Sequence, residues 1–251
     1  MNFMKTIKKL SAILAGSAFL TLGTVGIAQA ATITLDLKVS GTSIPWFAGM
    51  PDGYSYFSDT APAQSPTQVQ GLSLTPESTL SLTASGWGGL CETCNWRQRP
   101  DGLDSAYSTG EINGISGINA PWASLVGVFL GPDAPQLTPT PSALDFSTIA
   151  SQDYLTLSPQ LKQVFFIGDG RTSTGAQQNI IIPTGTSRFY LGMIDGVGAY
   201  NNNGPGFDVK ITGLSASDDR KSVPEPSSIL SLLALGIVGA SFLRKRKQQI
   251  S

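Results

Sequence analysis

Histidine is absent from all 251 residues of the sequence. Its absence excludes Ser-His-Asp and Cys-His catalysis, and it excludes a zinc or iron site with histidine ligands. An enzyme of this composition would need a pair of carboxylates, as in glycoside hydrolysis, or a metal ion held by oxygen atoms. We therefore expect a protein that is not an enzyme, and a glycoside-acting enzyme is the alternative that stays open.

Cysteine is scarce, and its two copies lie together as Cys91-Glu92-Thr93-Cys94. Two thiolates cannot complete a four-ligand zinc site, because the sequence offers no further cysteine or histidine. In an exported chain such a pair usually forms a disulfide that closes a tight loop. Free thiols and redox chemistry remain alternatives, although a redox Cys-x-x-Cys usually opens a helix and this pair follows a Gly-rich turn.

Charge is missing from two long apolar stretches, one near each end of the chain. Near the N-terminus, Lys5, Lys8 and Lys9 precede the uncharged stretch Leu10–Ile27, and Ala28-Gln29-Ala30 follows it. This order is typical of a secretory signal peptide over residues 1–30, cut by signal peptidase after Ala30. A retained N-terminal membrane helix is the alternative.

The C-terminus has the second apolar stretch, Ser227–Leu243, which is 17 residues long. As a helix it would be roughly 25 Å long, which is just enough for a thin bilayer core. The basic tail Arg244–Lys247 behind it cannot cross cheaply, so we expect a transmembrane helix over 227–243 in the inner membrane. An ordinary membrane anchor and a buried core helix are the alternatives.

Pro224, Glu225 and Pro226 stand directly before this helix, and the whole segment 223–251 resembles the PEP-CTERM sorting signal. That signal combines a Pro-Glu-Pro motif, one short hydrophobic helix and a basic tail at the extreme C-terminus. The resemblance implies a Gram-negative bacterium that makes exopolysaccharide, and an exosortase-type enzyme that processes the chain near the motif. Residues 31–222 would then be the exported body, transiently anchored and finally placed at the cell surface or in the extracellular matrix.

The exported body is acidic once the targeting segments are set aside. Seven of the 16 basic residues and one of the 17 acidic residues fall in those segments, which leaves nine against sixteen, a net charge of −7. Such a charge argues against nucleic acid as a partner and is compatible with binding a divalent cation.

Helical periodicity is also lacking in the body, and short strand patterns take its place. Apolar residues alternate with polar ones at 33–39, 80–84 and 207–211, and denser apolar runs occur at 125–130, 164–167, 180–182 and 189–194. Eight or nine strands in one all-β domain predict a single β-sandwich or jelly roll, galactose-binding-domain-like. A Pro-rich loop is expected at 132–141 and a polar linker at 215–222.

One loop between two of these strand patterns is rich in oxygen ligands. Residues 195–204 read DGVGAYNNNG, with one carboxylate and three amide side chains. Calcium prefers six to eight oxygen ligands, which Asp195, two of the asparagines and a carbonyl near Ala199 could supply in part. The alternative is a hairpin loop whose Asn and Gly residues only provide positive φ.

Several segments resemble the calcium-dependent galactophilic lectin family of the PA-I type. They are residues 70–87 (QGLSLTPESTLSLTASGW), Arg99-Pro100-Asp101-Gly102, Ser124–Val128, Phe189–Asp195, Asn202-Asn203-Gly204 and Phe207–Val209. The resemblance implies side-chain calcium ligands at Asp195, Asn202 and Asn203, and carbonyl ligands at Ala199 and Leu90. It implies a carbohydrate site of Asp101, Arg99, Asp195 and Asn202, in which the ion takes sugar hydroxyls directly.

This sequence departs from the lectin pattern at the sugar site. Arg99 and Gly102 stand where the galactose binder has His and Gln, so galactose itself is not implied. Tyr190 and Trp87 could stack on a sugar, but as strand residues they are expected in the core. The sequence therefore predicts an exported, calcium-dependent carbohydrate-binding protein that acts on exopolysaccharide or surface glycans. A structural matrix or biofilm protein with a purely structural calcium site is the alternative.

Overall fold

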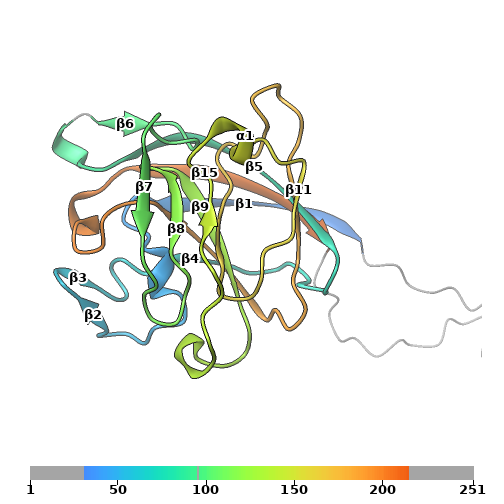
Figure 1. Ribbon diagram of the computed structural model, residues 1–251, viewed down its shortest axis with the longest axis horizontal. Helices are drawn as coiled ribbons and strands as arrows, with labels where there is room; N and C mark the ends of the chain where they lie inside the picture. The colour runs from blue at the N-terminus through green and yellow to red at the C-terminus, as the bar shows by residue number, and fades with distance from the viewer. Residues whose placement is uncertain (1–30, 95, 215–251) are drawn as a thin grey trace, which may run out of the picture. The chain divides into compact units, whose positions relative to one another are not determined.

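The computed structural model describes residues 31–94 and 96–214, all within one compact unit (Figure 1). The strands are β1 (Thr32–Ser40), β2 (Ser55–Tyr56), β3 (Asp59–Thr60), β4 (Thr67–Val69), β5 (Thr79–Gly89), β6 (Arg97–Gln98), β7 (Ala106–Thr109), β8 (Ile118–Pro121), β9 (Leu125–Leu130), β10 (Leu144–Asp145), β11 (Thr156–Leu157), β12 (Val164–Phe166), β13 (Asn179–Ile181), β14 (Arg188–Met193) and β15 (Gly206–Leu214). The helices are α1 (Ile149–Gln152) and the 3-10 turns η1 (Pro45–Phe47), η2 (Glu92–Cys94), η3 (Pro135–Leu137) and η4 (Tyr200–Asn202).

The larger sheet has the strand order β1-β15-β5-β13-β11, with β6 added beside the end of β5. Its three long strands are antiparallel, and Leu37 pairs with Val209, which pairs in turn with Ala84. Alternate residues of each strand face the same side of a sheet, so these apolar residues share the inner face. The polar residues between them face outward, as the alternating burial of β1 and β15 shows.

The second sheet has the order β12-β9-β14-β4, and its two central strands are almost fully buried. Inner residues of both sheets join one hydrophobic core, for example Leu82, Ile211, Phe129 and Leu191. Phe129 stacks against both Phe165 and Phe189, with centroid distances of 5.4 and 4.5 Å. Part of the core thus lies between the two sheets and part lies on the far face of the second sheet, which is buried on both sides. The described residues confirm the expected all-β class.

All seven strand patterns seen in the sequence correspond to strands, namely β1, β5, β9, β12, β13, β14 and β15. The described residues contain 15 strands rather than the expected eight or nine. The eight additional strands have four residues or fewer, too short to show a period of two. Three of them, β4, β10 and β11, pair only with strands that are not their neighbours in sequence, and the others pair with an adjacent strand.

The signal peptide, the linker beyond residue 214, the sorting motif, the 227–243 helix and the basic tail lie outside the described residues. Within the described residues, no helix combines the length and the apolar character needed to cross a membrane.

Candidate calcium site and its surroundings

The loop between β14 and β15 passes from the second sheet to the larger one, and Tyr200 fixes it from inside. This residue is fully buried, and its hydroxyl donates to the Met193 carbonyl (2.8 Å) while accepting the Asp195 N–H (2.9 Å). Burial raises the pKa of Tyr200 well above its ordinary value, so the phenol stays protonated and remains a donor. The buried Tyr200 phenol therefore holds the beginning of this loop in place.

Asp195 and Asn203 meet at the base of this loop. The Asn203 amide donates to Oδ2 of Asp195 at 2.7 Å, and the Gly196 N–H donates to Oδ1 at 2.6 Å. The two residues are only 4% and 5% exposed. Burial, and secondarily the negative charge of Asp59, raise the pKa of Asp195, against the lowering effect of these hydrogen bonds.

The amide oxygen of Asn203 is buried and accepts no hydrogen bond among the described residues. Its amide nitrogen is engaged, because it also donates to the Gly41 carbonyl at 3.2 Å. A buried acceptor without a donor is costly, and a water or an ion is one explanation for it in a native protein. The orphaned oxygen and the neighbouring carboxylate are of the kind that calcium ligates, so this observation fits the expected ion.

Asp59, in the short strand β3, is a second buried carboxylate that reasoning from the sequence missed. It is 0% exposed, and it accepts the backbone N–H groups of Gly198 (2.5 Å), Asn201 (3.2 Å) and Tyr200 (3.5 Å). The neighbouring Ser58 hydroxyl donates to the Gly198 carbonyl. These contacts span about 140 positions of sequence, and no local pattern around Asp59 signals them.

No basic side chain offsets these two carboxylates within the described part of the chain. The ion pairs found there are Lys38–Asp208 and Lys210–Asp36, both on the outer face of the larger sheet. No cluster of three or more His, Cys, Asp or Glu side chains occurs in 31–94 and 96–214 either. A cation at this loop would therefore rely on amide and carbonyl oxygens as well as on Asp195.

The other residues expected to bind calcium, Asn202, Ala199 and Leu90, differ in their surroundings. Asn202 is exposed, and its side chain makes no hydrogen bond with another described residue. Ala199 is the N-cap of η4, where the carbonyl ordinarily accepts the first bond of the turn. Leu90 directly follows Gly89, whose carbonyl accepts the Gly204 N–H at 3.1 Å. The structure thus brings together Asp195, Asn203 and the end of β5, and leaves the Asn202 side chain outside this contact.

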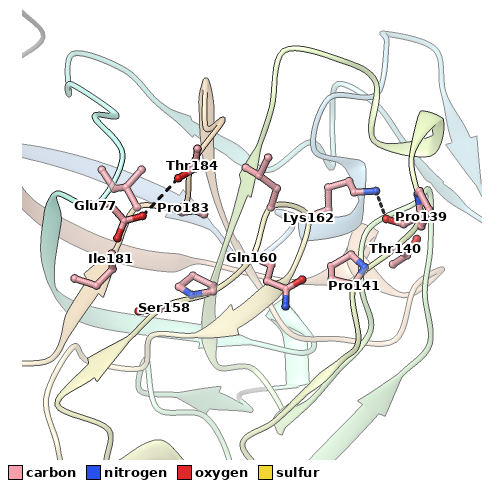
Figure 2. Close-up of a pocket in the computed structure, with 13 residues that line it drawn as sticks. Glu77, Pro139, Thr140, Pro141, Ser158, Gln160, Lys162, Ile181, Pro183 and Thr184 are labelled. Carbon is pink, nitrogen blue, oxygen red and sulfur yellow. Dashed lines mark hydrogen bonds between the residues drawn. The ribbon is translucent and has the colours of Figure 1, made fainter.

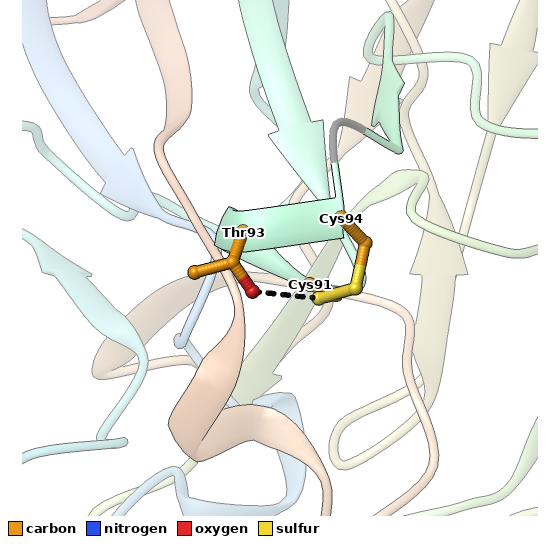
Figure 3. The surroundings of a disulfide bond; sticks show 3 residues. All are labelled: Cys91, Thr93 and Cys94. Atoms are coloured by element: carbon orange, nitrogen blue, oxygen red, sulfur yellow. Dashed lines mark hydrogen bonds between the residues drawn. A yellow bond between two sulfur atoms is a disulfide. The ribbon is translucent and has the colours of Figure 1, made fainter.

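Cys91 and Cys94 are joined by a disulfide at the hairpin tip beyond β5 (Figure 3). The bridge encloses η2, and the side chain of Glu92 reaches the backbone of Gly204. The two cysteines therefore form the expected disulfide, and the tight loop that it closes lies beside the end of the loop between β14 and β15.

The expected carbohydrate residues fall in two places. Arg99 and Asp101 line a hollow of about 250 Å³ together with Trp87 and Asp169. The Arg99 guanidinium lies 5.7 Å from the Trp87 ring centroid, and Asp101 accepts the Asp169 N–H at 2.8 Å. Asp195 and Asn202 do not line this hollow, so the four residues do not form one continuous site.

The two aromatic residues weighed from the sequence differ. Tyr190 is buried, as expected for a strand residue, whereas Trp87 is 46% exposed, and its expected burial was wrong. Trp87 is near the end of β5 on the outer side of the sheet, where the Arg99 guanidinium covers only part of it. Tyr107 and Trp122 form a separate aromatic stack, with ring centroids 3.7 Å apart. This stack lies beside the loop between β14 and β15, as shown by the short distance from a Cβ placed on Gly196 to the Tyr107 hydroxyl.

A hollow of about 670 Å³ is lined by none of the expected site residues (Figure 2). It lies along the Pro-rich loop, where Lys162 donates to the carbonyls of Thr138 and Pro139 at 2.7 Å and of Pro135 at 3.2 Å. Burial lowers the pKa of Lys162 from its ordinary value. Because the ammonium uses all three donors on loop carbonyls, we interpret its role as structural.

Comparison with known protein families gives a match at the C-terminus. A family model described as the PEP-CTERM protein-sorting motif matches residues 222–247. The C-terminal segment is a PEP-CTERM sorting signal. It indicates an exported, surface-sorted protein with a C-terminal anchor that an exosortase-type enzyme processes. No curated protein matches the chain, and the resemblance to the galactophilic lectins gains no support from these comparisons.

Proposed function

We propose that the exported body is a calcium-dependent carbohydrate-binding module that is delivered to the cell surface or matrix by its sorting signal. The observation that carries the calcium part is the orphaned, buried amide oxygen of Asn203 beside the carboxylate of Asp195. A bound ion would satisfy this oxygen and offset the charge of two buried carboxylates that have no basic partner in the described residues.

The carbohydrate part rests on the surroundings of the loop. Gly196 and Val197 are half-buried and Ala199 is exposed, so one side of the loop reaches solvent. The Tyr107–Trp122 stack beside it offers an aromatic surface of the kind on which sugar rings pack. We interpret the two enclosing sheets as a β-sandwich of the galactose-binding type, and exopolysaccharide or surface glycans as the ligands.

A second candidate function is favoured by the burial of the same residues. Asp195 and Asn203 are so little exposed that an ion beside them would be sealed inside the loop. Such an ion would only stabilise the fold, and the protein would be a structural component of the extracellular matrix.

Calorimetric titration of residues 31–222 with monosaccharides and with exopolysaccharide, each with calcium and with chelator, separates the two functions. The described part of this span contains the hydrophobic core. Carbohydrate heat that requires calcium supports the binding module. Calcium binding without carbohydrate heat under either condition supports the structural protein and overturns the carbohydrate proposal.

A further inference from the structure

The outer face of the larger sheet is polar and nearly neutral. Across β1 and β15 the pairs Lys38–Asp208 and Lys210–Asp36 neutralise one another, the second at 2.9 Å. Their neighbour β5 presents Thr83 and Ser85 on the same face, in register with Lys210 and Asp208. This face therefore offers hydroxyl groups and matched charges, with no excess of either sign to attract a polyelectrolyte.

Three hollows run together along this face. The first, about 570 Å³, lies over the charge pairs, and the second, about 520 Å³, shares Lys38 and Asp208 with it. The third is the hollow of Arg99 and Asp101, which shares Ser85 with the first and Trp87 with the second. Because each hollow shares lining residues with the other two, they form one extended groove, called here the outer-face groove.

Trp87 stands where two of these hollows meet. Arg99 lies against its ring from one side, and Gly206 is its strand partner on the other. Gly206 has φ +116°, and a Cβ there would lie 2.1 Å from the Val39 carbonyl oxygen, so no side chain can fill that position. The side of Trp87 toward β15 is therefore left open to the groove.

Hydroxyl groups line the groove beside this open side. They belong to Ser40, Thr42, Ser65 and Thr67, whereas Ser43, which also lines this hollow, is buried. Ser40 and Thr42 already contact one another at 2.8 Å, whereas the Ser65 hydroxyl has no hydrogen-bond partner among the described residues. An exposed indole with hydroxyl donors and acceptors around it matches the alternating apolar faces and hydroxyl edges of sugar rings.

We propose that the outer-face groove binds an extended chain of neutral sugars, with one ring stacked on Trp87. The groove's three adjoining hollows, of about 570, 520 and 250 Å³, have room for several sugar rings rather than for one. Its lining has three basic and four acidic side chains, and this lack of a positive excess disfavours an anionic polymer. This inference rests on the carbohydrate part of the proposed function and not on calcium, because neither Asp195 nor Asn203 lines the groove.

Affinity electrophoresis tests the groove, using residues 31–222 in native gels that contain dextran, galactomannan or exopolysaccharide from the source bacterium. The wild type is expected to be retarded by at least one of them. Trp87→Ala should weaken the retardation about tenfold or more, as truncation of a central aromatic contact does. Trp87→Phe, which keeps a stacking ring, should restore part of it.

Trp96→Ala is the matched control, because Trp96 is 64% exposed and lines none of the three hollows. It should migrate like the wild type. Thermal melting of Trp87→Ala in calcium and in chelator checks that the variant is folded and still responds to the ion. A variant that melts normally yet loses retardation supports the groove.

The outcomes separate this inference from the calcium proposal. Retardation that survives Trp87→Ala, or is lost equally in Trp96→Ala, overturns the groove. If chelator abolishes retardation while Trp87→Ala does not, the groove is wrong and the calcium-dependent site stands. If Trp87→Ala abolishes it while chelator has no effect, the groove stands and calcium dependence is wrong. No retardation of the wild type in any gel counts against both.

Discussion

Asp59 is the residue whose replacement should damage the candidate calcium loop most. Its buried carboxylate accepts the N–H groups of Gly198 and Asn201, and more weakly that of Tyr200. Asp59→Ala leaves these donors without an acceptor, at about 1–3 kcal/mol for each one that water cannot reach. Asn201 is exposed and can turn to water. We therefore expect a loss of about 2–4 kcal/mol in the free energy of unfolding.

At about 2–4 °C per kcal/mol for a domain of this size, that loss lowers Tm by roughly 5–15 °C. Differential scanning calorimetry of residues 31–222 in chelator measures it without any contribution from calcium. Asp59→Asn keeps one acceptor oxygen, so its loss should be smaller. Asp52→Ala, an exposed carboxylate in the preceding turn, is the control and should melt like the wild type. Equal melting of Asp59→Ala and Asp52→Ala would refute the anchoring role.

Three further predictions concern other parts of the body. Lys162→Met removes the donor from three loop carbonyls and should lower the free energy of unfolding by about 2–4 kcal/mol; a urea midpoint equal to that of the wild type would contradict this. Replacing Cys91 and Cys94 together by serine removes a four-residue closed loop and should cost about 2 kcal/mol by the chain-entropy relation, seen as a lower Tm that reductant no longer changes. Burial raises the pKa of the Asp101 carboxyl above its ordinary 3.8, so the folded state binds the carboxyl proton more tightly than the unfolded state does. The free energy of unfolding should therefore fall as the pH rises from 3.8 through the raised pKa of the folded state. Asp101→Asn should remove that fall, and pH-dependent melting identical to that of the wild type would show that Asp101 is not its source.

The strands that position the candidate site were predictable because their patterns are local. Leu35 and Leu37 alternate with exposed charged residues, and residues 125–130 are apolar without interruption. The burial of both segments can therefore be predicted from their own sequence. The short strands were not predictable. Two residues such as those of β3 carry no period, and they form only where the chain folds back on itself.

The candidate site could likewise be predicted only where it depends on residues that are close together in the sequence. Asp195 and the asparagines after it announce an oxygen-rich loop. However, the sequence does not reveal that Asn203 is turned inward while Asn202 faces solvent, because that depends on Tyr200 and on distant Asp59. Trp87 was expected in the core by residue type. It is exposed because it lies on the outer face of β5, together with Thr83 and Ser85, and its strand partner there is a glycine.

The calcium-dependent shift in Tm tests the central claim most directly. Calcium that binds only the folded loop adds about 2.7 kcal/mol at 100 times Kd, which is roughly 5–10 °C for a domain of this size. Asp195→Asn removes the only carboxylate of the loop and should abolish most of the shift, while in chelator it melts close to the wild type. Asn202→Ala should reduce the shift less. No shift in the wild type, or a full shift in Asp195→Asn, would contradict the account.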